Sequence, residues 1–340
     1  MKIRISIGLL LVSLWFQTNA YAAVNEYHLI KKLPLGGEGG WDALTVDSHA
    51  GRLYLSRGTH VMVVDLSTDR VVGDIPNTPG VHGIALVPDL DRGFISAGKI
   101  DTVIIFDLKT LKVLGQVKTG VNPDIILYDS FSKKVFVFNG KSNDATVISP
   151  ASGEAVGTIA LGGKPEFAVS NDNGRIFVNL EDKSEVVEID SVKQTALRRF
   201  PLDPGQEPTG IAFDKAHKHI FSACHNKMMV ILDAETGKVA ATVPTGENVD
   251  GAGFDEQTGL AFSPNGDGTL TVIQETAGRY AVVETVPTQY GARTMALDPK
   301  THMVYLPTAL FSKTETITLP NGKVRPAMIK NSFTVLVVGK

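Results

Sequence analysis

Seven polar residues recur along the chain at nearly constant intervals, each opening a short apolar stretch that predicts a strand. Their successive separations are 40, 42, 42, 43, 41 and 43 residues. The seven are Asp42, His82, Asp124, Glu166, Thr209, Asp250 and Arg293. If the fold brings them into one ring, four carboxylates and one arginine give a charge of −3 when His82 is neutral. Carboxylates so close together either hold protons more tightly or attract a cation.

The chemistry that such a ring supports is the binding of a divalent metal ion or a cationic group. Carboxylate oxygens suit Ca²⁺ or Mg²⁺. The expected metal ligands are Asp42, Asp124, Glu166 and Asp250. The expected ligand-binding set adds His82 and Arg293, and no catalytic residue is assigned. The alternative is that these side chains cap strand starts, bind backbone amides and hold water in a channel.

Two further residues are expected at the rim of this ring. Trp41 precedes Asp42 and would either stack on a ligand or pack beneath the ring. Arg325 lies in a 22-residue insertion, 310–331, which interrupts the last repeat and predicts a projecting hairpin. The insertion carries a charge of +3, from Lys313, Lys323, Arg325 and Lys330 against Glu315. It is expected to act as a lid, a docking element or a salt-stabilised loop.

Composition excludes several classes of protein and site. The chain of 340 residues has 33 basic and 36 acidic residues, a near balance that argues against a nucleic-acid partner. Its single cysteine, Cys224, excludes a disulfide framework, a c-type haem attachment and a four-cysteine metal site. Cys224 and His225 are adjacent on a predicted strand, so their side chains point to opposite sides. We therefore expect a packed thiol rather than a nucleophile or a soft-metal ligand.

The elements that position the ring are predicted to be short β-strands. Each repeat of about 42 residues contains several apolar stretches separated by turns. Stretches such as 53–55 and 176–178 are rich in β-branched and aromatic residues, and Asp172-Asn173-Gly174 suits a tight turn. Four strands in a repeat of this size form a propeller blade. The sequence therefore predicts an all-β, seven-bladed β-propeller as a single domain over residues 23–340.

The two ends of the chain are expected to complete the same blade. Without the first 22 residues and the insertion 310–331, 296 residues remain, which is seven units of about 42. The last repeat ends on a third strand over 333–337, whereas a strand over 27–33 precedes the first repeat. Pairing of these two strands would close the ring and remove exposed sheet edges.

The first 22 residues have the pattern of a signal peptide. Lys2 and Arg4 precede an apolar stretch over 5–16, and residues 20–22 alternate as small, any and small. Twelve apolar residues are too few to cross a hydrocarbon core of ~30 Å, which argues against the alternative of an uncleaved membrane anchor. We expect a mature chain that begins at Ala23 and is exported to the periplasm or secreted.

The blade pattern resembles a known repeat. The segment Gly162-Gly163-Lys164-Pro165-Glu166-Phe167-Ala168-Val169, continuing to Glu188-Ile189-Asp190, is similar to the YVTN-type β-propeller repeat. The whole mature chain, including its ending over 332–338, resembles exported YncE-like proteins. This resemblance implies a seven-bladed propeller and implies no single activity. The repeats depart from Tyr-Val-Thr-Asn at their strand ends, which here read Cys224-His225-Asn226 and Ser96-Ala97-Gly98.

The sequence favours a monomeric, exported module that binds a small molecule or a protein partner at the channel mouth. The rival interpretation is an enzyme of the lactonase or lyase kind. In that case a metal held by the carboxylates polarises a carbonyl group and His82 is the general base. A third interpretation is a scaffold that docks a protein or a polyanion through the basic insertion.

Overall fold

The computed structural model describes residues 26–318, 322 and 324–340. The expected signal peptide and the expected start of the mature chain at Ala23 lie outside these residues, as does Lys323. The described chain consists of strands, turns and three short 3-10 helices, η1 (Pro88–Leu90), η2 (Gly98–Ile100) and η3 (Glu181–Lys183). None of its helices has the length and apolar character that a membrane crossing requires.

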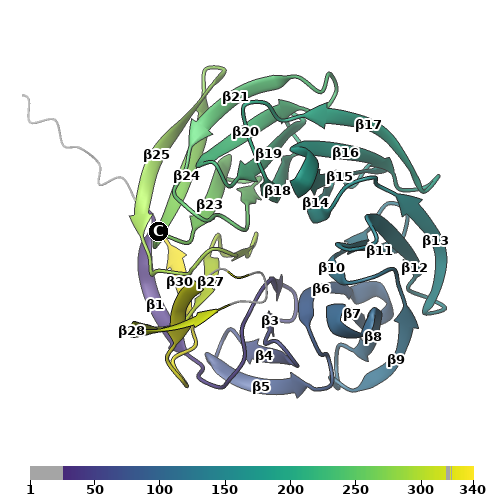
Figure 1. Cartoon of the computed structure of the whole chain (residues 1–340), viewed down its shortest axis with the longest axis vertical. Coiled ribbons are helices and arrows are strands. Elements are labelled where there is room, and N and C mark those ends of the chain that lie inside the picture. Colours follow the sequence, from purple (N-terminus) through teal and green to yellow (C-terminus); the bar gives the residue numbers. More distant parts are fainter. Residues whose placement is uncertain (1–25, 319–321, 323) are drawn as a thin grey trace, which may run out of the picture.

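Seven four-stranded antiparallel sheets surround a central axis, which confirms the predicted all-β, seven-bladed propeller (Figure 1). In blades 1 to 6 the strands follow chain order from the axis outward. Blade 1 comprises β2 (Leu44–Asp47), β3 (Arg52–Ser56), β4 (Val61–Asp65) and β5 (Arg70–Ile75). Blade 2 comprises β6 (Val81–Val87), β7 (Arg92–Ala97), β8 (Thr102–Asp107) and β9 (Val113–Lys118). Blade 3 comprises β10 (Pro123–Asp129), β11 (Lys134–Asn139), β12 (Asp144–Ser149) and β13 (Glu154–Ala160). Blade 4 comprises β14 (Pro165–Ser170), β15 (Arg175–Leu180), β16 (Glu185–Asp190) and β17 (Thr195–Pro201). Blade 5 comprises β18 (Pro208–Asp214), β19 (His219–Cys224), β20 (Met228–Asp233) and β21 (Val239–Pro244). Blade 6 comprises β22 (Gly253–Asp255), β23 (Leu260–Asn265), β24 (Thr269–Thr276) and β25 (Arg279–Pro287).

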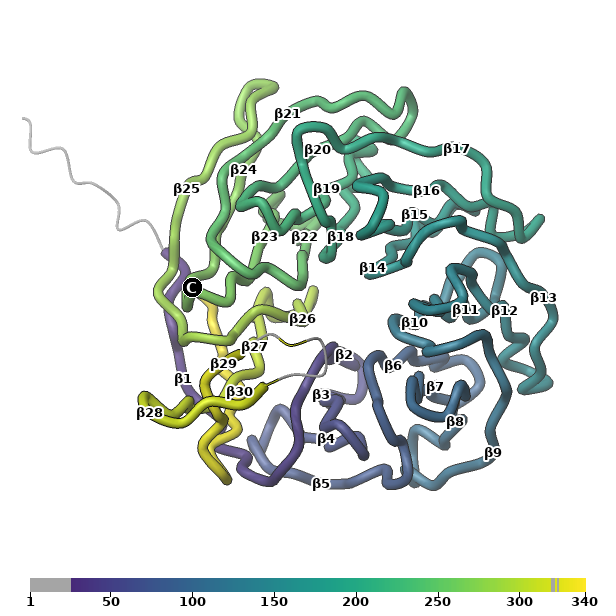
Figure 2. The backbone as a smooth tube through the Cα atoms, in the orientation of Figure 1, coloured from purple at the N-terminus to yellow at the C-terminus, as the bar shows by residue number. Residues whose placement is uncertain are grey.

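Blade 7 joins the two ends of the described chain (Figure 2). From the axis outward, its strands are β26 (Ala296–Leu297), β27 (Val304–Thr308), β30 (Thr334–Gly339) and β1 (His28–Pro34). β1 runs antiparallel to β30, with Leu33 opposite Val335. The predicted closure of the ring by the N-terminal strand is therefore confirmed.

Seven apolar cores hold the ring together, one between each pair of neighbouring blades. Because side chains alternate across a strand, a single strand contributes to two of these cores. Tyr54 of β3 packs toward blade 2, whereas Leu53 and Leu55 of the same strand pack toward blade 7. Stacking thus buries both faces of every blade, which an isolated four-stranded sheet cannot do.

The insertion leaves blade 7 between β27 and β30, and two of its segments form a separate two-stranded sheet. β28 (Phe311–Thr318) pairs with β29 (Val324–Met328), and Ile317 lies opposite Arg325. At the base of this hairpin, the Phe311 ring lies 5.3 Å from the ring of Tyr290 and 6.3 Å from that of Trp41. The insertion is therefore anchored beside the residue that precedes Asp42.

The first strands are less uniform than the repeat predicts. In blades 2 to 5 they have six or seven residues and include the ring residue. By contrast, β2, β22 and β26 begin two or three residues after Asp42, Asp250 and Arg293, so the strand starts expected there are wrong. At Asp250 the backbone bonds to the next blade instead of within its own sheet. The Asp250 amide donates to the Arg293 carbonyl at 3.0 Å.

Candidate functional site

The ring residues of blades 2 to 5 are located at β-bulges. Val81 pairs with Ala97 and Ile84 pairs with Ile95, so two residues of β6, beginning with His82, lie opposite one residue of β7. The same shift in register follows the first residue of the pairing in blades 3, 4 and 5, at Asp124, Glu166 and Thr209. A bulge bends its strand and changes the direction of the side chain it carries. The repeat predicted these positions, but it did not predict the bulges.

Side chains from second strands link neighbouring ring positions. The Ser96 hydroxyl of blade 2 donates to the Asp124 carbonyl of blade 3. Asn179 of blade 4 donates to the Thr209 carbonyl of blade 5 at 3.0 Å. The Thr209 hydroxyl donates in turn to the Val249 carbonyl at 3.1 Å, and Thr209 is only 2% exposed. Thr209 therefore supports the ring and contributes little to its surface.

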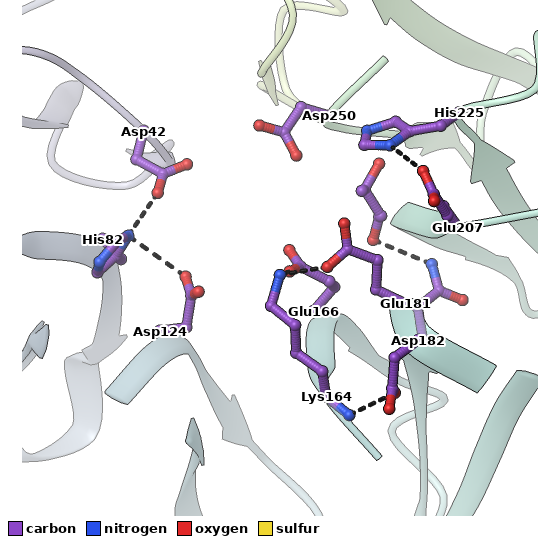
Figure 3. Close-up of polar contacts among 12 residues, drawn as sticks. Asp42, His82, Asp124, Lys164, Glu166, Glu181, Asp182, Glu207, His225 and Asp250 are labelled. Atoms are coloured by element: carbon purple, nitrogen blue, oxygen red, sulfur yellow. Dashed lines mark hydrogen bonds and ion pairs between the residues drawn. The ribbon is translucent and has the colours of Figure 1, made fainter. Parts of the chain in front are cut away.

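Three of the expected site residues form one cluster, contributed by blades 1, 2 and 3 (Figure 3). The Nδ1 atom of His82 lies 2.6 Å from Oδ2 of Asp42 and 3.4 Å from Oδ1 of Asp124. One potential ligand atom from each residue falls within 4.8 Å of the other two. Their side chains are partly accessible, with exposed fractions of 25% for Asp42, 29% for His82 and 15% for Asp124. We call these three residues the His82 cluster.

Two groups of the His82 cluster, His82 and Asp124, have raised pKa values. Burial lowers the pKa of His82, but the hydrogen bond with Asp42 and the two nearby carboxylates outweigh burial and raise it to about 9. Burial raises the pKa of Asp124 to about 6, although the charge of His82 acts in the opposite direction. An imidazolium ion between two carboxylates is thus the favoured state at neutral pH.

A second group on the ring combines Glu166 with two residues that the sequence reasoning did not assign to the site. The Nζ atom of Lys164 lies 2.7 Å from Oε1 of Glu166 and also contacts Glu181, as Figure 3 shows. Burial and the neighbouring Asp124 raise the pKa of Glu166 to about 9, and Lys164 only partly offsets this. Glu166 and Glu181 together raise the pKa of Lys164 despite its burial. The available signal was the closeness of Lys164 and Glu166 in the sequence, on either side of Pro165 where β14 begins.

Asp250 and Arg293 form a third group, across blades 6 and 7. Nη2 of Arg293 lies 3.1 Å from Oδ2 of Asp250. Burial raises the pKa of Asp250 to about 7, while Arg293 acts to lower it. The structure thus divides the four expected metal ligands. Asp42 and Asp124 meet at His82, whereas Glu166 and Asp250 each pair with a cation from their own part of the ring.

The two expected rim residues occupy different environments. Trp41 is half-buried, and its ring lies 5.4 Å from that of Phe333, between blade 7 and the base of the insertion. Arg325 is exposed on β29. Among the described residues, Arg325 has no hydrogen bond or ion pair with the ring. Trp41 therefore contributes to packing beside Asp42, and Arg325 is part of the insertion's basic surface.

Cys224 is buried at the end of β19, and we expect its thiol to react only after unfolding. Burial raises the pKa of Cys224 to about 12, so its reactive thiolate is scarce at neutral pH. Labelling with a disulfide-exchange reagent should be at least about 100-fold slower in the native protein than in the unfolded chain. Rapid labelling under native conditions would show that the thiol is accessible and would contradict this prediction.

The far end of the channel carries a cavity of about 370 Å³, away from the charged ring. It is lined by the later residues of β2, β6 and β10, among them Val46, Leu86 and Tyr128. The cavity thus combines apolar side chains with Thr45, Asp47 and Ser48, and it is separate from the His82 cluster.

Comparison with known proteins establishes the fold. No family model and no curated protein matches the sequence. The chain is similar to a solved structure described as Kuenenia stuttgartiensis Hydrazine Synthase, with a TM-score of 0.69 and 17% identity over 86% of this chain and 96% of that one. It is also similar to one described as Structure of U3-55K, with a TM-score of 0.74 and 10% identity over 92% and 98% of the two chains. Identities this low show shared architecture and carry no information on activity.

Proposed function

We propose that this protein is a binding module that holds a divalent metal ion at its channel mouth and recognises a ligand there. The observation that carries the proposal is the His82 cluster, in which one nitrogen and two carboxylate oxygens lie within 4.8 Å of one another. Each ligand atom comes from a different blade, so the rigid ring fixes the spacing before a metal arrives. Three protein ligands leave coordination positions open for a ligand atom.

The donor set favours a transition metal over Ca²⁺ or Mg²⁺. Imidazole nitrogen suits zinc, copper, iron and nickel, whereas Ca²⁺ takes oxygen ligands in larger numbers. Glu166 and Asp250, which would supply more oxygens, are paired with Lys164 and Arg293. We therefore propose that Asp42, His82 and Asp124 bind the metal, with Zn²⁺ preferred.

Protons and metal compete for the same atoms of the His82 cluster. The Nδ1 atom of His82 faces both carboxylates, so the metal must displace the proton now shared with Asp42. Metal binding should therefore release a proton and weaken as the pH falls below the pKa of His82, about 9. The same competition would let a change in pH release the ion.

We expect isothermal titration of metal-free protein to show one tightly bound Zn²⁺ per chain and much weaker binding of Ca²⁺. The Asp124→Asn variant removes one ligand oxygen charge and should weaken the transition-metal affinity by at least about 100-fold, since removal of outer-shell partners alone costs 10–100-fold. Equilibrium dialysis followed by metal analysis gives the stoichiometry independently.

Asp182→Asn is the matched control for this titration. Asp182 is an aspartate near the same mouth, but its side chain is 42% exposed and lies outside the His82 cluster. This variant should bind the metal like the wild type. If the wild-type protein binds no divalent ion, or if Asp124→Asn binds as tightly as the wild type, the proposal is wrong.

A metal-assisted lactonase or lyase is the second candidate, and the state of Glu166 favours it. A carboxyl group whose pKa is raised to about 9 is protonated at neutral pH and can act as a general acid. It faces the same mouth as the His82 cluster in Figure 3. Turnover of lactone or uronate substrates by the metal-loaded protein, lost in Glu166→Gln with metal binding unchanged, would support this candidate over simple binding.

We also propose that the protein belongs with exported YncE-like propellers. The blade repeat and the ending of the chain support this membership, and the apolar stretch over 5–16 after two basic residues supports export. Fractionation of cells that express the full-length chain would test export. Recovery of an uncleaved chain from the cytoplasm would argue against it.

A further inference from the structure

Arg57, directly after β3, is a buried cation without an anionic partner. It is 0% exposed and is the largest of the fully buried side chains. Its guanidinium group lies over the Phe333 ring, 3.5 Å from the ring centroid. Its hydrogen bonds run from Nη2 to the Gly36 and Glu38 carbonyls, at 3.4 and 3.0 Å. Within the described chain, Nε and Nη1 donate to no acceptor.

This arrangement is costly unless something else binds the guanidinium group. Arginine is almost never fully buried unless it is paired, and unsatisfied N–H groups in a core destabilise the fold. The remaining residues of the chain cannot supply a side-chain carboxylate, because 1–25, 319–321 and 323 contain no Asp or Glu. An anionic partner for Arg57 is therefore expected to come from outside the chain.

The segment that covers the Arg57 side chain makes few hydrogen bonds to the rest of the described structure. Residues 36–40, which we call the glycine strap, read Gly-Gly-Glu-Gly-Gly, and 37–40 are exposed. In the described structure, no backbone amide or carbonyl from Gly37 to Trp41 bonds to another segment except through Nη2 of Arg57. Gly39 must be a glycine, since its φ is 95° and a Cβ there would lie 2.8 Å from the Arg57 carbonyl oxygen. A segment with so few bonds opens at low cost.

The strap and Arg57 adjoin the charged mouth. The hydroxyl of Ser56, the residue before Arg57, accepts a hydrogen bond from the Asp42 amide at 2.8 Å. Trp41 joins the strap to Asp42 and shares the Phe333 ring with Arg57. A molecule bound at the mouth is therefore within reach of the strap and of the guanidinium group beneath it.

We propose that Arg57 is an anion-binding residue, and that an oxyanion, either a carboxylate or a phosphate, enters beneath the glycine strap, takes the place of the strap carbonyls at Nη2 and bonds to Nη2 together with Nε or Nη1. Guanidinium groups match the geometry of both oxyanions. The Phe333 ring and the burial of the site would strengthen the pairing, because charges attract more strongly where water is excluded. The proposal goes beyond metal binding and does not depend on it.

The test compares anions at matched ionic strength, on protein freed of divalent ions by a chelating resin. Sodium phosphate and sodium acetate should each be compared with sodium chloride by thermal unfolding. For an anion that binds, we expect the wild-type gain in Tm to exceed the gain of Arg57→Met by at least about 2 °C. Whether this excess appears with phosphate alone, with acetate alone or with both identifies the class of oxyanion. Salts that are excluded from the protein surface also raise the Tm of Arg57→Met, so the difference between the two proteins removes this general effect.

Two further comparisons keep the test decisive. Arg70→Met, on the exposed strand β5, should respond to each anion like the wild type. Arg57→Met without an anion should be at least as stable as the wild type, because it removes an unsatisfied cation. If this variant does not fold, amide exchange of residues 36–41 in the wild type decides, and it should slow several-fold when the anion binds. Equal gains in wild type and Arg57→Met, or unchanged exchange in the strap, would overturn the proposal whatever the metal titration shows.

Discussion

Leu33→Asp is expected to lower the free energy of unfolding by about 4–5 kcal/mol or to prevent folding. Leu33 is 3% exposed and lies in the core between blades 7 and 1, on the strand that closes the ring. A carboxylate there would be buried without a partner and would also weaken the pairing of β1 with β30. Urea unfolding followed by far-ultraviolet circular dichroism measures the loss.

Lys32→Asp provides the control on the same strand. Lys32 is exposed, pairs in register with Leu336 through its backbone and bonds through Nζ to Gln289 at 2.9 Å. Its loss should change stability by no more than about 0.5 kcal/mol. If Leu33→Asp unfolds at the same urea concentration as Lys32→Asp, β1 is not an energetic part of blade 7 and the closure carries little stability.

The metal-free protein is expected to lose stability as the pH rises from about 5 to about 9, with the midpoint of thermal unfolding falling by several degrees. The carboxyl pKa values are raised above their ordinary values, to about 6 for Asp124, about 7 for Asp250 and about 9 for Glu166. The pKa of His82 is raised as well, to about 9. The folded state therefore binds more protons than the unfolded state across this range, so raising the pH favours unfolding.

The slope should be at least about 1.4 kcal/mol per pH unit above neutrality, because each additional bound proton contributes that amount. For His82 the stabilisation is complete below its ordinary value of 6.5 and is lost as the pH rises through about 9. Burial is the largest cause of the raised carboxyl pKa values, and the groups that face them are Asp42, His82, Lys164, Glu181 and Arg293.

Glu166→Gln isolates the contribution of the largest shift. A glutamine mimics the protonated carboxyl and cannot ionise, so the stability of this variant should fall less steeply with pH than that of the wild type. Glu154→Gln, at an exposed glutamate of β13, should leave the slope unchanged. A wild-type stability that is constant or rises from about pH 6 to about pH 9 would show that the ring does not retain these protons.

The seven blades and their closure could be predicted because they depend on period and alternation. Continuous apolar runs such as Leu53-Tyr54-Leu55 are visible in the sequence, and they are typical of strands buried on both faces, as the two cores that share these residues show. The N-terminal strand, which precedes the first repeat, could then pair only with the third strand of the last repeat. What could not be predicted is where the first strands begin. That depends on hydrogen bonds between blades, such as the one from the Asp250 amide to the Arg293 carbonyl.

The ring positions could be predicted, but the chemical groups that they form could not. The repeat predicted that Asp42, His82 and Asp124 occupy equivalent positions in consecutive blades, and the structure places them within 4.8 Å of one another. The pairing of Glu166 with Lys164 and the burial of Arg57 depend on side-chain packing and on a glycine-rich loop. Neither leaves a periodic signal in the sequence.

The pairing of β1 with β30 also constrains when the protein can finish folding during synthesis. The Thr334 hydroxyl donates to the Leu33 carbonyl at 2.9 Å, across a separation of 301 residues. At about 5–20 residues per second, a ribosome needs roughly 15–60 seconds to make that intervening chain. Until then the strand that will seal the ring has no neighbour. Blades 1 to 6 can stack as they emerge, but the last interface waits until β30 has been made.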